Sequence, residues 1–597
     1  MWGIVVREAW RSVLRVGERE IISLVLLLVM IFMLVLPIVY LLTSSIDLQQ
    51  MLEILTSVKI PPDGELYTVY NYPGYVLIYI TGADYGPVVN SLLLSTLVSL
   101  VVILLSMVTV IASLSMSRAR WFFGYLLPLL ASIPMPFLSA YVVIHLFHRD
   151  LGIVNIVLGS LGMGFRIAID GLAGIALYQI IHFLPLAHLF LLSYAESIDR
   201  GLIEASWNLG AGARATITRI LIPIMRPAII AVWSLIFILS IEDLVGPLTF
   251  SRHNAARNLL SYQAYIGFIS EYGYQVSPRI ASFVFVMLII TIAMLIPLYR
   301  YLSISRLGVV SFKGIYIEVG GIKGSLLRIF ASILLIISLA PNIMVLLYSV
   351  TKGWFLSTSP SLAWLDNYID VLVSPYYQRA MINTVVYTLV ASILILILGY
   401  FSAYASMRFG GGVATAIEAL SIAPLVIPGV AIGIAYYQLF HSVARGMPID
   451  PVYTPWIYLV MSYTIRRLPY MVRPLEASLQ SIPRSYEEAS FNLGSGVVRT
   501  MWGIGFPMIF RSVSVGLVIT SIHVMTEVST SLILIGSPAV SSTHPSPITP
   551  VIASLLVYDP LLIHRASSML ILTLSIVIIL SLIISNIASR ILKLPRS

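Results

Sequence analysis

Long apolar stretches, separated by short polar segments, run through most of the 597-residue chain. A bilayer span needs about 20 consecutive apolar residues, and this length divides the sequence into twelve candidate spans. The first six are expected at residues 21–42, 88–114, 122–146, 167–192, 224–249 and 280–302. The second six are expected at residues 328–350, 383–407, 414–440, 454–474, 508–535 and 561–587. The pattern predicts an all-α polytopic integral membrane protein with about twelve transmembrane helices.

A polar linker at residues 303–327 separates the two sets of spans. We therefore expect an N-terminal half at residues 1–302 and a C-terminal half at residues 328–597. The longest polar interruption, residues 43–87, is rich in tyrosine. Two interpretations fit it: a packed cap on the outer face, or an aromatic belt where the helices meet the lipid headgroups.

One polar segment occurs twice, at residues 204–223 and 488–507, with ten of its twenty positions identical in the same register. At the same offset, Asp243 matches Glu527. Each copy follows the fourth span of its half, so both copies should lie on one side of the membrane. The halves are therefore expected to be parallel six-helix repeats, related by an axis along the membrane normal.

The composition supports a membrane protein, because 59% of the residues are hydrophobic, only 10% are charged and the mean hydropathy is +0.96. A soluble domain is about 25% charged. The absence of cysteine excludes disulfides, thiol catalysis and cysteine-ligated metals. The net charge is +9. In a membrane protein such an excess usually comes from basic residues in cytoplasmic loops and near lipid headgroups, rather than from nucleic-acid binding.

The distribution of basic residues predicts the orientation. With both termini on the cytoplasmic side, 25 of the 35 lysines and arginines fall on that side, as the positive-inside rule requires. Both copies of the repeated segment are then cytoplasmic. The apolar run at residues 21–42 is longer than the core of a signal peptide, so we expect it to be an uncleaved first span.

The repeated segment has the composition of two short helices with a tight turn between them. Glu204 suits a helix start, Gly210 and Gly212 suit the turn, and Pro223 can open the next span. The repeated segment would then fold as a compact helix-turn-helix with small residues at its tip, and such a shape could fit a groove on another protein. The alternative is an ordinary amphipathic connector, but recurrence in register favours the first interpretation.

Both copies resemble the EAA loop found in permease subunits of ATP-binding-cassette (ABC) importers. That pattern begins with Glu-Ala-Ala, followed at fixed spacing by glycine, isoleucine and proline. The matching residues are Glu204, Ala205, Gly210, Ile220 and Pro223 in the first copy, and Glu488, Ala489, Gly494, Ile504 and Pro507 in the second. The chain departs mildly from the pattern at its third position, where Ser206 and Ser490 replace alanine.

The resemblance implies a fused permease of two six-span halves, similar to the ferric iron and thiamine permeases of binding-protein-dependent importers. In such families the EAA loop docks in a groove of the ATPase subunit. The partners implied are two copies of a cytoplasmic ABC ATPase and an extracytoplasmic substrate-binding protein, at the inner (cytoplasmic) cell membrane. The ATPase-coupling residues implied are Glu204, Ala205, Gly210, Gly212, Pro223, Glu488, Ala489, Gly494, Gly496 and Pro507.

The chain itself carries no signature of an ATPase. A phosphate-binding loop requires Gly-Lys-Ser/Thr, and none of the five lysines follows a glycine. We therefore expect the chain not to be an enzyme and to hold no cofactor, with ATP bound by the partner subunits.

Three carboxylates, Glu242, Asp243 and Glu527, fall within predicted spans. Such residues are costly in a membrane and frequently functional, so they are candidates for the translocation path, where they could attract a cation. The alternatives are structural hydrogen bonds between helices, or contact with interfacial water. His182 and His188 are six residues apart and do not share a helix face, so we expect packing or helix-bonding roles and no metal site.

By resemblance, the first candidate solute is ferric iron, with thiamine, polyamines, phosphonates and other small solutes as alternatives. A different class of protein, a secondary transporter with parallel six-helix repeats, would need an ion-coupling site inside the bundle and gives no reason for the duplicated segment. An integral membrane enzyme would need clustered intramembrane His, Asp or Glu residues, and the pattern is too sparse for one.

Overall fold

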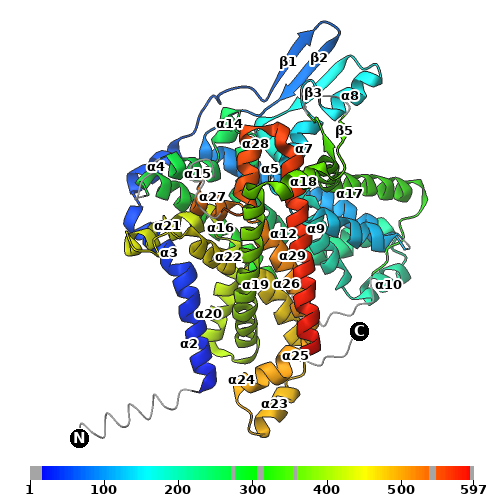
Figure 1. Cartoon of the computed structure of the whole chain (residues 1–597). Helices are drawn as coiled ribbons and strands as arrows, with labels where there is room; N and C mark the ends of the chain where they lie inside the picture. Colours follow the sequence, from blue (N-terminus) through cyan, green and yellow to red (C-terminus); the bar gives the residue numbers. More distant parts are fainter. Residues whose placement is uncertain are drawn as a thin grey trace. The chain divides into compact units, whose positions relative to one another are not determined.

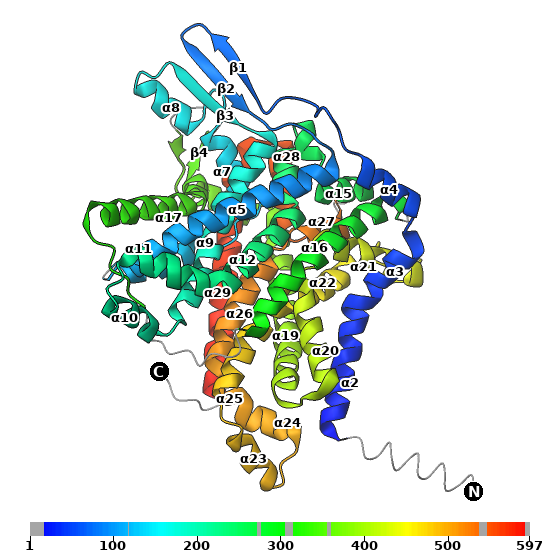
Figure 2. The ribbon, with the colours of Figure 1, turned by 180° about the vertical axis from the view of Figure 1, so that it is seen from behind.

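The computed structural model describes residues 17–117, 119–270, 276–304, 315–354, 360–536 and 546–591, with side chains except at 298–304 and 588–591. Helices dominate the described residues, and five short strands complete the regular structure (Figures 1 and 2). The chain divides into two compact units. The first unit comprises Met1–Ser44, Arg379–Pro550 and Leu572–Ser597, and the second comprises Ser45–Gln378 and Val551–Ile571.

The first unit combines the first helix of the chain with helices of the C-terminal half. Its helices are α2 (Glu18–Met30), α3 (Leu36–Ser45), α19 (Pro375–Arg408), α20 (Gly411–Ile422), α21 (Gly429–Ala444), α22 (Pro455–Ser481), α23 (Ser485–Asn492), α24 (Val497–Thr500), α25 (Phe506–Met508), α26 (Phe510–Met525), α27 (Ser529–Ile535) and the later part of α29 (Ile563–Ile591). Leu26 and Met30 of α2 share one buried core with Ile395, Leu468 and Leu517.

The second unit contains most of the N-terminal half. Its helices are α4 (Leu48–Thr56), α5 (Pro87–Leu114), α6 (Leu127–Ala131), α7 (Leu138–Leu146), α8 (Ile153–Ser160), α9 (Gly171–Glu196), α10 (Arg200–Asn208), α11 (Ala213–Thr216), α12 (Ile222–Glu242), α13 (Val245–Thr249), α14 (Asn254–Arg257), α15 (Leu260–Ser270), α16 (Pro278–Ile304), α17 (Gly321–Val350), α18 (Asp366–Val373), most of α28 (Ile548–Tyr558) and the start of α29. Its strands are β1 (Tyr67–Tyr72), β2 (Tyr75–Ile80), β3 (Phe165–Ile169), β4 (Thr351–Lys352) and β5 (Ser361–Leu362). Ala331 of α17 packs against Ala112 and Met116.

The first span of each sequence half therefore lies in the unit built mainly from the other half. Helices α2 and α3 belong to the first unit, and α17 packs against α5, α6, α7 and α9 in the second. The contact-defined units do not follow the sequence boundaries at residues 302 and 328. The division into two permease halves stays a prediction, and residues 305–314 of the expected linker lie outside the described residues.

The all-α class is confirmed, and all twelve predicted spans are largely helical. Among the described residues, eight helices are long and apolar enough to cross a membrane, and two bent pairs raise this number to ten. The other two predicted spans differ for physical reasons. Residues 122–146 break between α6 and α7, where Pro134 and Pro136 lack a backbone donor. Helix α22 is continuous but carries Arg466 and Arg467.

The tyrosine-rich loop folds into a β-hairpin, which the sequence analysis did not predict. Strands β1 and β2 pair antiparallel, and β3 joins β2 in parallel, in the order β1-β2-β3. The turn between β1 and β2 contains Pro73 and Gly74, and Gly74 has φ +92°, a conformation that glycine adopts without strain. Because β3 ends where α9 begins, the sheet and α10 lie at opposite ends of α9 (Figure 2).

Candidate coupling site and buried charge network

Helices α10 and α11 form a helix-turn-helix, which we call the first knob (residues 199–216). Asp199 caps α10 by accepting a hydrogen bond from the Gly201 amide at 2.9 Å. The turn closes through the Ala211 amide, which donates to the Ser206 carbonyl at 3.0 Å. Gly210 has φ +79°, so this position favours glycine, as the sequence analysis expected at the end of the first helix.

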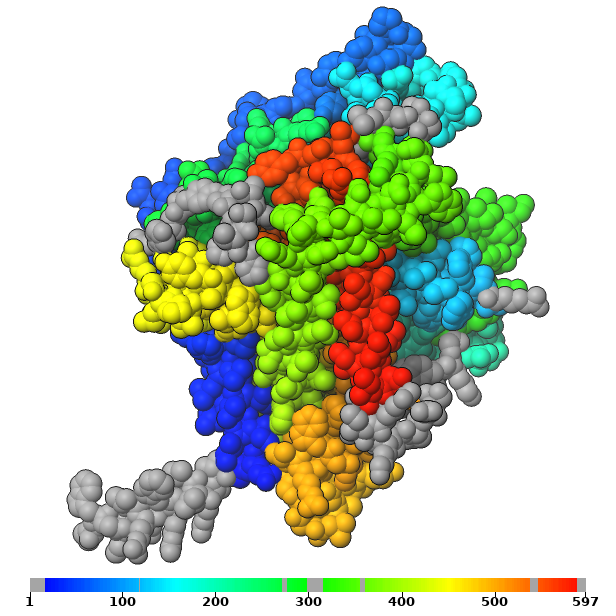
Figure 3. Space-filling view, in the orientation of Figure 1, coloured from blue at the N-terminus to red at the C-terminus, as the bar shows by residue number. Residues whose placement is uncertain are grey.

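Helices α23 and α24 form the second knob (residues 484–500), which appears at the lower end of the first unit in Figure 3. Its Ser495 amide donates to the Ser490 carbonyl at 3.1 Å, and Gly494 has φ +82°. The closing hydrogen bond and the backbone conformation of the turn are therefore the same in both copies. The sequence repeat is also a structural repeat.

A buried hydroxyl pair fastens the two helices of each knob together. Ser206 Oγ lies 2.8 Å from Thr216 Oγ1, and Ser490 Oγ lies 2.8 Å from Thr500 Oγ1. All four side chains are buried. The serine that replaces alanine in the EAA pattern therefore has a structural role in this chain, because each serine has a threonine partner ten residues later.

The tip of each knob presents one leucine almost fully to the surroundings. Leu209 is 88% exposed and Leu493 is 87% exposed. No neighbouring atom approaches the position that a Cβ would take at Gly210 or Gly494, so both tips stand clear of their own units. An exposed leucine at the same place on two matching tips is the kind of apolar anchor that a protein partner buries.

The other residues predicted to couple to an ATPase lie on or beside these tips. Glu204, Ala205, Gly212, Glu488, Ala489 and Gly496 are exposed, and Pro223 and Pro507 are half-buried near the start of the helices that follow. The sequence analysis did not select Leu209 and Leu493. Their identity in both copies, as apolar residues beside the turn glycine, was the signal that could have found them.

The second knob is anchored within its unit by charged groups. The Glu18 carboxylate of α2 accepts hydrogen bonds from the Val497 and Val498 amides at the start of α24. Arg408 Nε lies 2.9 Å from Glu487 Oε1, with both side chains buried. In the first knob the corresponding segment carries an exposed ion pair, with Arg200 Nε 2.7 Å from Glu204 Oε1.

The predicted path carboxylates lie where their helices break. Glu527 lies between α26 and α27, is 1% exposed, and accepts from Arg466 Nη1 at 3.0 Å and from Arg467. Asp243 lies between α12 and α13 and accepts from Gln179 Nε2 at 3.0 Å. These contacts fit the alternative interpretation, structural hydrogen bonds between helices. The positive guanidinium groups of Arg466 and Arg467 lie against the negative carboxylate of Glu527.

Asp243 also caps the short helix that follows it. Its two carboxylate oxygens accept hydrogen bonds from the amides of Val245 and Gly246, each at 3.0 Å. Its neighbour Glu242 is buried at the end of α12. The path role of all three carboxylates stays a prediction.

The two histidines of α9 have the roles that their spacing predicted. His188 hydrogen-bonds Thr109 Oγ1 at 2.8 Å through Nδ1 and the Gly124 carbonyl at 3.1 Å through Nε2, so it links three elements. His182 stacks on Tyr178, with ring centroids 5.7 Å apart. The packing and helix-bonding interpretation is confirmed for this pair.

Comparisons with known proteins find similarity to transport permeases. Residues 395–593, which include the second knob, match the family described as "binding-protein-dependent transport system inner membrane component". The ferric transport system permease protein FbpB of Actinobacillus pleuropneumoniae is 25% identical over 457 residues, covering 75% of this chain and 64% of that protein. The chain thus aligns with less than two thirds of that protein's length.

Two further relatives show the range of this similarity. The putative ferric transport system permease protein FbpB 1 of Haemophilus influenzae is 24% identical, covering 75% of this chain and 70% of that protein. The molybdenum transport system permease protein ModB of Mycobacterium tuberculosis is 25% identical, covering 28% of this chain and 65% of that protein. The similarity to binding-protein-dependent transport system inner membrane components thus lies in residues 395–593, and the candidate spans make the chain a multi-pass integral membrane protein.

Proposed function

We propose that the chain is the fused membrane subunit of an ATP-driven importer. A substrate-binding protein delivers the solute from outside, and two cytoplasmic ABC ATPases hold one knob each. Closure of the ATPase pair on ATP moves the knobs and switches access to the translocation path from one side of the membrane to the other. Such gating requires rigid handles, and each knob has a capped or anchored helix and a buried hydroxyl pair.

The observation that carries the proposal is the structural identity of the two tips. Both turns close with the same backbone hydrogen bond, both contain a glycine of positive φ, and both expose a leucine. A connector that only joined helices would have no reason to keep an apolar tip in two copies. Two ATPase copies with identical grooves would require two matching tips.

The proposed orientation places both knobs and both termini in the cytoplasm. It is supported by the excess of lysine and arginine on that side. The same orientation puts the β1-β2-β3 sheet outside, where the binding protein would dock. The chain would not hydrolyse ATP itself, because the phosphate-binding sequence is absent from it.

Ferric iron is the proposed solute. It is supported by similarity to two proteins named as ferric transport permeases, each of which aligns over 75% of the chain. Uptake of radioactive ferric iron into membrane vesicles that contain the permease, its ATPase and a ferric-binding protein would test this substrate. Uptake of thiamine, a polyamine or a phosphonate in place of iron would change the substrate and leave the importer mechanism intact.

Co-purification tests the importer mechanism. The chain is expressed with candidate ATPase subunits, and the wild type is compared with the double variant Leu209→Asp/Leu493→Asp. Ile60→Asp is the matched control, because Ile60 is 86% exposed and belongs to neither knob, lying in the loop between α4 and β1. We expect two ATPases on the wild type and the control, and none on the double variant. Equal retention by all three proteins would overturn the proposal.

A second comparison separates the importer from a secondary transporter. Vesicles carrying the chain alone are energised with a proton gradient, and vesicles carrying the chain with the ATPase receive ATP. Uptake only with ATP and the ATPase supports the importer. Uptake driven by the gradient alone would establish the secondary transporter instead.

A further inference from the structure

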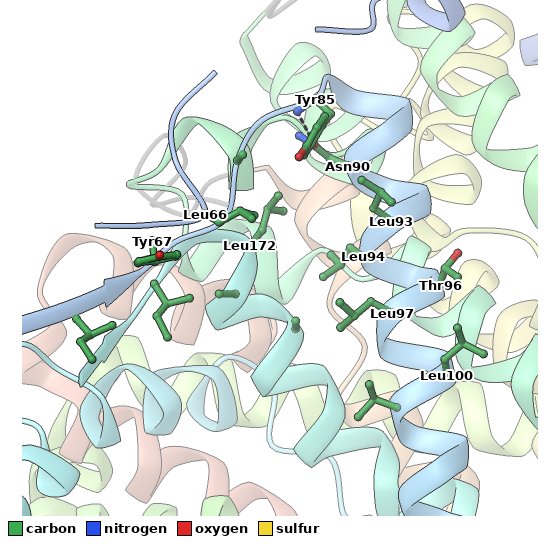
Figure 4. A pocket seen from close by; sticks show the side chains of 17 residues that line it. Leu66, Tyr67, Tyr85, Asn90, Leu93, Leu94, Thr96, Leu97, Leu100 and Leu172 are labelled. Carbon is green, nitrogen blue, oxygen red and sulfur yellow. Dashed lines mark hydrogen bonds between the residues drawn. The ribbon is translucent and has the colours of Figure 1, made fainter. Parts of the chain in front are cut away.

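An apolar groove of about 930 Å³ lies between the β1-β2-β3 sheet and helices α5 and α9 of the second unit. Figure 4 shows its lining side chains, with Leu97 and Leu100 on α5 and Tyr67 on the strand opposite. Ile78 of β2 and Ala173 of α9 complete the walls. The lining is almost wholly hydrocarbon, so the groove suits an apolar occupant.

The sheet turns an apolar face towards this groove. Side chains alternate between the two faces of a strand, and the register pairs Tyr67 with Ile80 and Val69 with Ile78. The opposite face carries Tyr79, whose hydroxyl lies 2.7 Å from His253 Nε2. The face of the sheet over the groove thus carries Ile78 and Ile80, whereas Tyr79 points away from the groove.

The groove is continuous with an exposed apolar stripe on α5. Helix α5 is a candidate membrane span, and Leu93, Leu97, Leu100 and Leu104 form a stripe along it that is half or more exposed. Their spacing of four, three and four residues places them on one helix face. Leu97 and Leu100 line the groove and also belong to this stripe, so lipid at the helix surface has direct access to the groove.

The groove lies alongside the first half of the candidate membrane span α5. At a rise of 1.5 Å per residue, Leu93 and Leu100 lie about 9 and 20 Å along α5 from Pro87, within a hydrocarbon layer of about 30 Å. The sheet has an open edge and cannot lie in hydrocarbon, because its unpaired backbone groups would lack partners. With the sheet outside the hydrocarbon, a lipid in the groove would have its headgroup beside Tyr67 and Tyr85 and its acyl chain beside Leu97 and Leu100.

We propose that this groove binds an acyl chain of a bilayer phospholipid, with the headgroup beside Tyr67 and Tyr85. The polar rim and apolar floor match the two parts of a lipid. A small water-soluble solute fits poorly, because the Asn90 amide, a polar group at the rim, already accepts from the Tyr85 backbone and donates to Asp84. The proposal is independent of the transported solute. In the orientation proposed above, the lipid belongs to the outer leaflet.

Single-cysteine labelling tests this assignment cleanly, because the chain has no native cysteine. Ala173→Cys and Ile78→Cys report on the groove, Leu104→Cys on the open lipid surface, and Tyr70→Cys on the polar face of the sheet. Each variant is labelled with bimane and reconstituted into nanodiscs of phosphatidylcholine that carries a nitroxide on its acyl chain. Iodide serves as the aqueous quencher.

We expect the nitroxide lipid to quench both groove labels to an extent comparable with Leu104→Cys, and iodide to quench only Tyr70→Cys. Quenching of the groove labels by iodide would show a water-filled groove and overturn the proposal. Protection from both quenchers would show a protein segment or another occupant and would also overturn it. Two groove positions are used so that a misfolded variant at one leaves the test intact.

The number of retained lipids provides a second measurement. Native mass spectrometry counts phospholipids on the purified chain during stepwise delipidation. Ala173→Phe narrows the groove, whereas Leu104→Phe adds the same ring to the open lipid face. We expect Ala173→Phe to lose one tightly held phospholipid relative to the wild type and Leu104→Phe to retain it. Equal lipid counts in all three proteins would contradict the acyl-chain site.

Discussion

The hydroxyl oxygens of Ser490 and Thr500 lie 2.8 Å apart inside the second knob, and the same pair recurs in the first knob as Ser206 and Thr216. Each threonine hydroxyl also reaches the carbonyl of the glycine four residues before it. The pair joins the helix before the turn to the helix after it. It therefore fixes the angle at which the leucine tip is presented.

Removing this pair should loosen the knob without unfolding the chain. Ser490→Ala deletes one buried hydrogen bond, which is worth about 1 kcal/mol. Amide hydrogen exchange in residues 490–500 should then be about fivefold faster, the rate equivalent of that energy. Ser481→Ala, an exposed serine just before the knob, serves as the control and should leave exchange unchanged. An unchanged exchange rate in Ser490→Ala would contradict the proposal that the Ser490–Thr500 pair stabilises the knob.

The contact between Glu18 and α24 predicts an asymmetry between the two knobs. Glu18→Gln removes the negative charge that the first amides of α24 bind, and a charged acceptor is stronger than a neutral one. Exchange at Val497 and Val498 should accelerate, while the corresponding residues of the first knob should not respond. Glu20→Gln, which removes a neighbouring charge from the same helix turn, is the control. An equal response in both knobs would contradict the anchoring by α2.

The charge network around Glu527 predicts a large loss of stability. Glu527→Gln removes the buried carboxylate charge that Arg466 and Arg467 contact, and breaking a buried ion pair in this way costs about 3–5 kcal/mol. The variant should aggregate at a much lower temperature than the wild type in a thermal assay in detergent. Adding Arg467→Gln should restore part of the loss.

Asp243→Asn provides the comparison for that network. It keeps an acceptor oxygen for the α13 amides and should cost only about 1 kcal/mol. If these carboxylates instead serve the translocation path, Asp243→Asn and Glu527→Gln will leave thermal stability unchanged and abolish uptake. Thermal stability and uptake measured on the same preparations separate the two roles.

Asp84, in the loop before α5, should make the stability of the fold depend on pH. Burial opposes ionisation of Asp84, but hydrogen bonds from Lys59, the Gly86 amide, Asn258 and Asn90 outweigh it and lower its pKa. A carboxyl with a lowered pKa in the folded state stabilises the fold above its unfolded pKa of about 3.9 and loses that contribution as the pH falls through the folded value. Asp84→Asn should therefore melt below the wild type at pH 7.

The same comparison at acid pH completes the test. As the pH falls from the unfolded pKa through the lower folded value, the wild-type carboxyl also becomes neutral, so the difference in melting temperature between Asp84→Asn and the wild type should shrink as the pH falls towards 3. Asp63→Asn is a suitable control, because Asp63 also pairs with Lys59 but its side chain is 71% exposed. A difference in melting temperature that stays constant from pH 7 to pH 3 would show that the Asp84 charge does not contribute.

The helical class and the two knobs could be predicted from sequence because both rest on local patterns. A run of apolar residues identifies a membrane helix wherever it packs, and a glycine at a repeated turn identifies the end of a short helix. Gly210 and Gly494 were selected for this reason, and both have positive φ. In the sequence, Ser206 and Ser490 are only a mild departure from the EAA pattern. Their hydrogen bonds to a threonine ten residues later can be recognised only once the geometry of the turn is known.

Non-local contacts escaped the sequence analysis. The packing of α17 on α5 and of α2 on the C-terminal helices depends on surfaces far apart in the chain. Strand β3 pairs with β2 at an offset of 89 residues, for example Val76 with Phe165, and neither strand's sequence indicates this partner. The partners of Glu527 lie 60 and 61 positions away on α22, so a buried counter-charge was not visible beside it in the sequence.

Site-specific crosslinking at the knob tips tests the central claim most directly. Leu209→Cys and Leu493→Cys, each in the otherwise cysteine-free chain, are treated with a short thiol-to-amine crosslinker in the presence of the ATPase, with Ile60→Cys as the equally exposed control. We predict that each tip cysteine links to one ATPase subunit and that Ile60→Cys links to none. Failure of both tips to crosslink, or equal crosslinking at Ile60, would contradict the assignment of the knobs as the ATPase-coupling site.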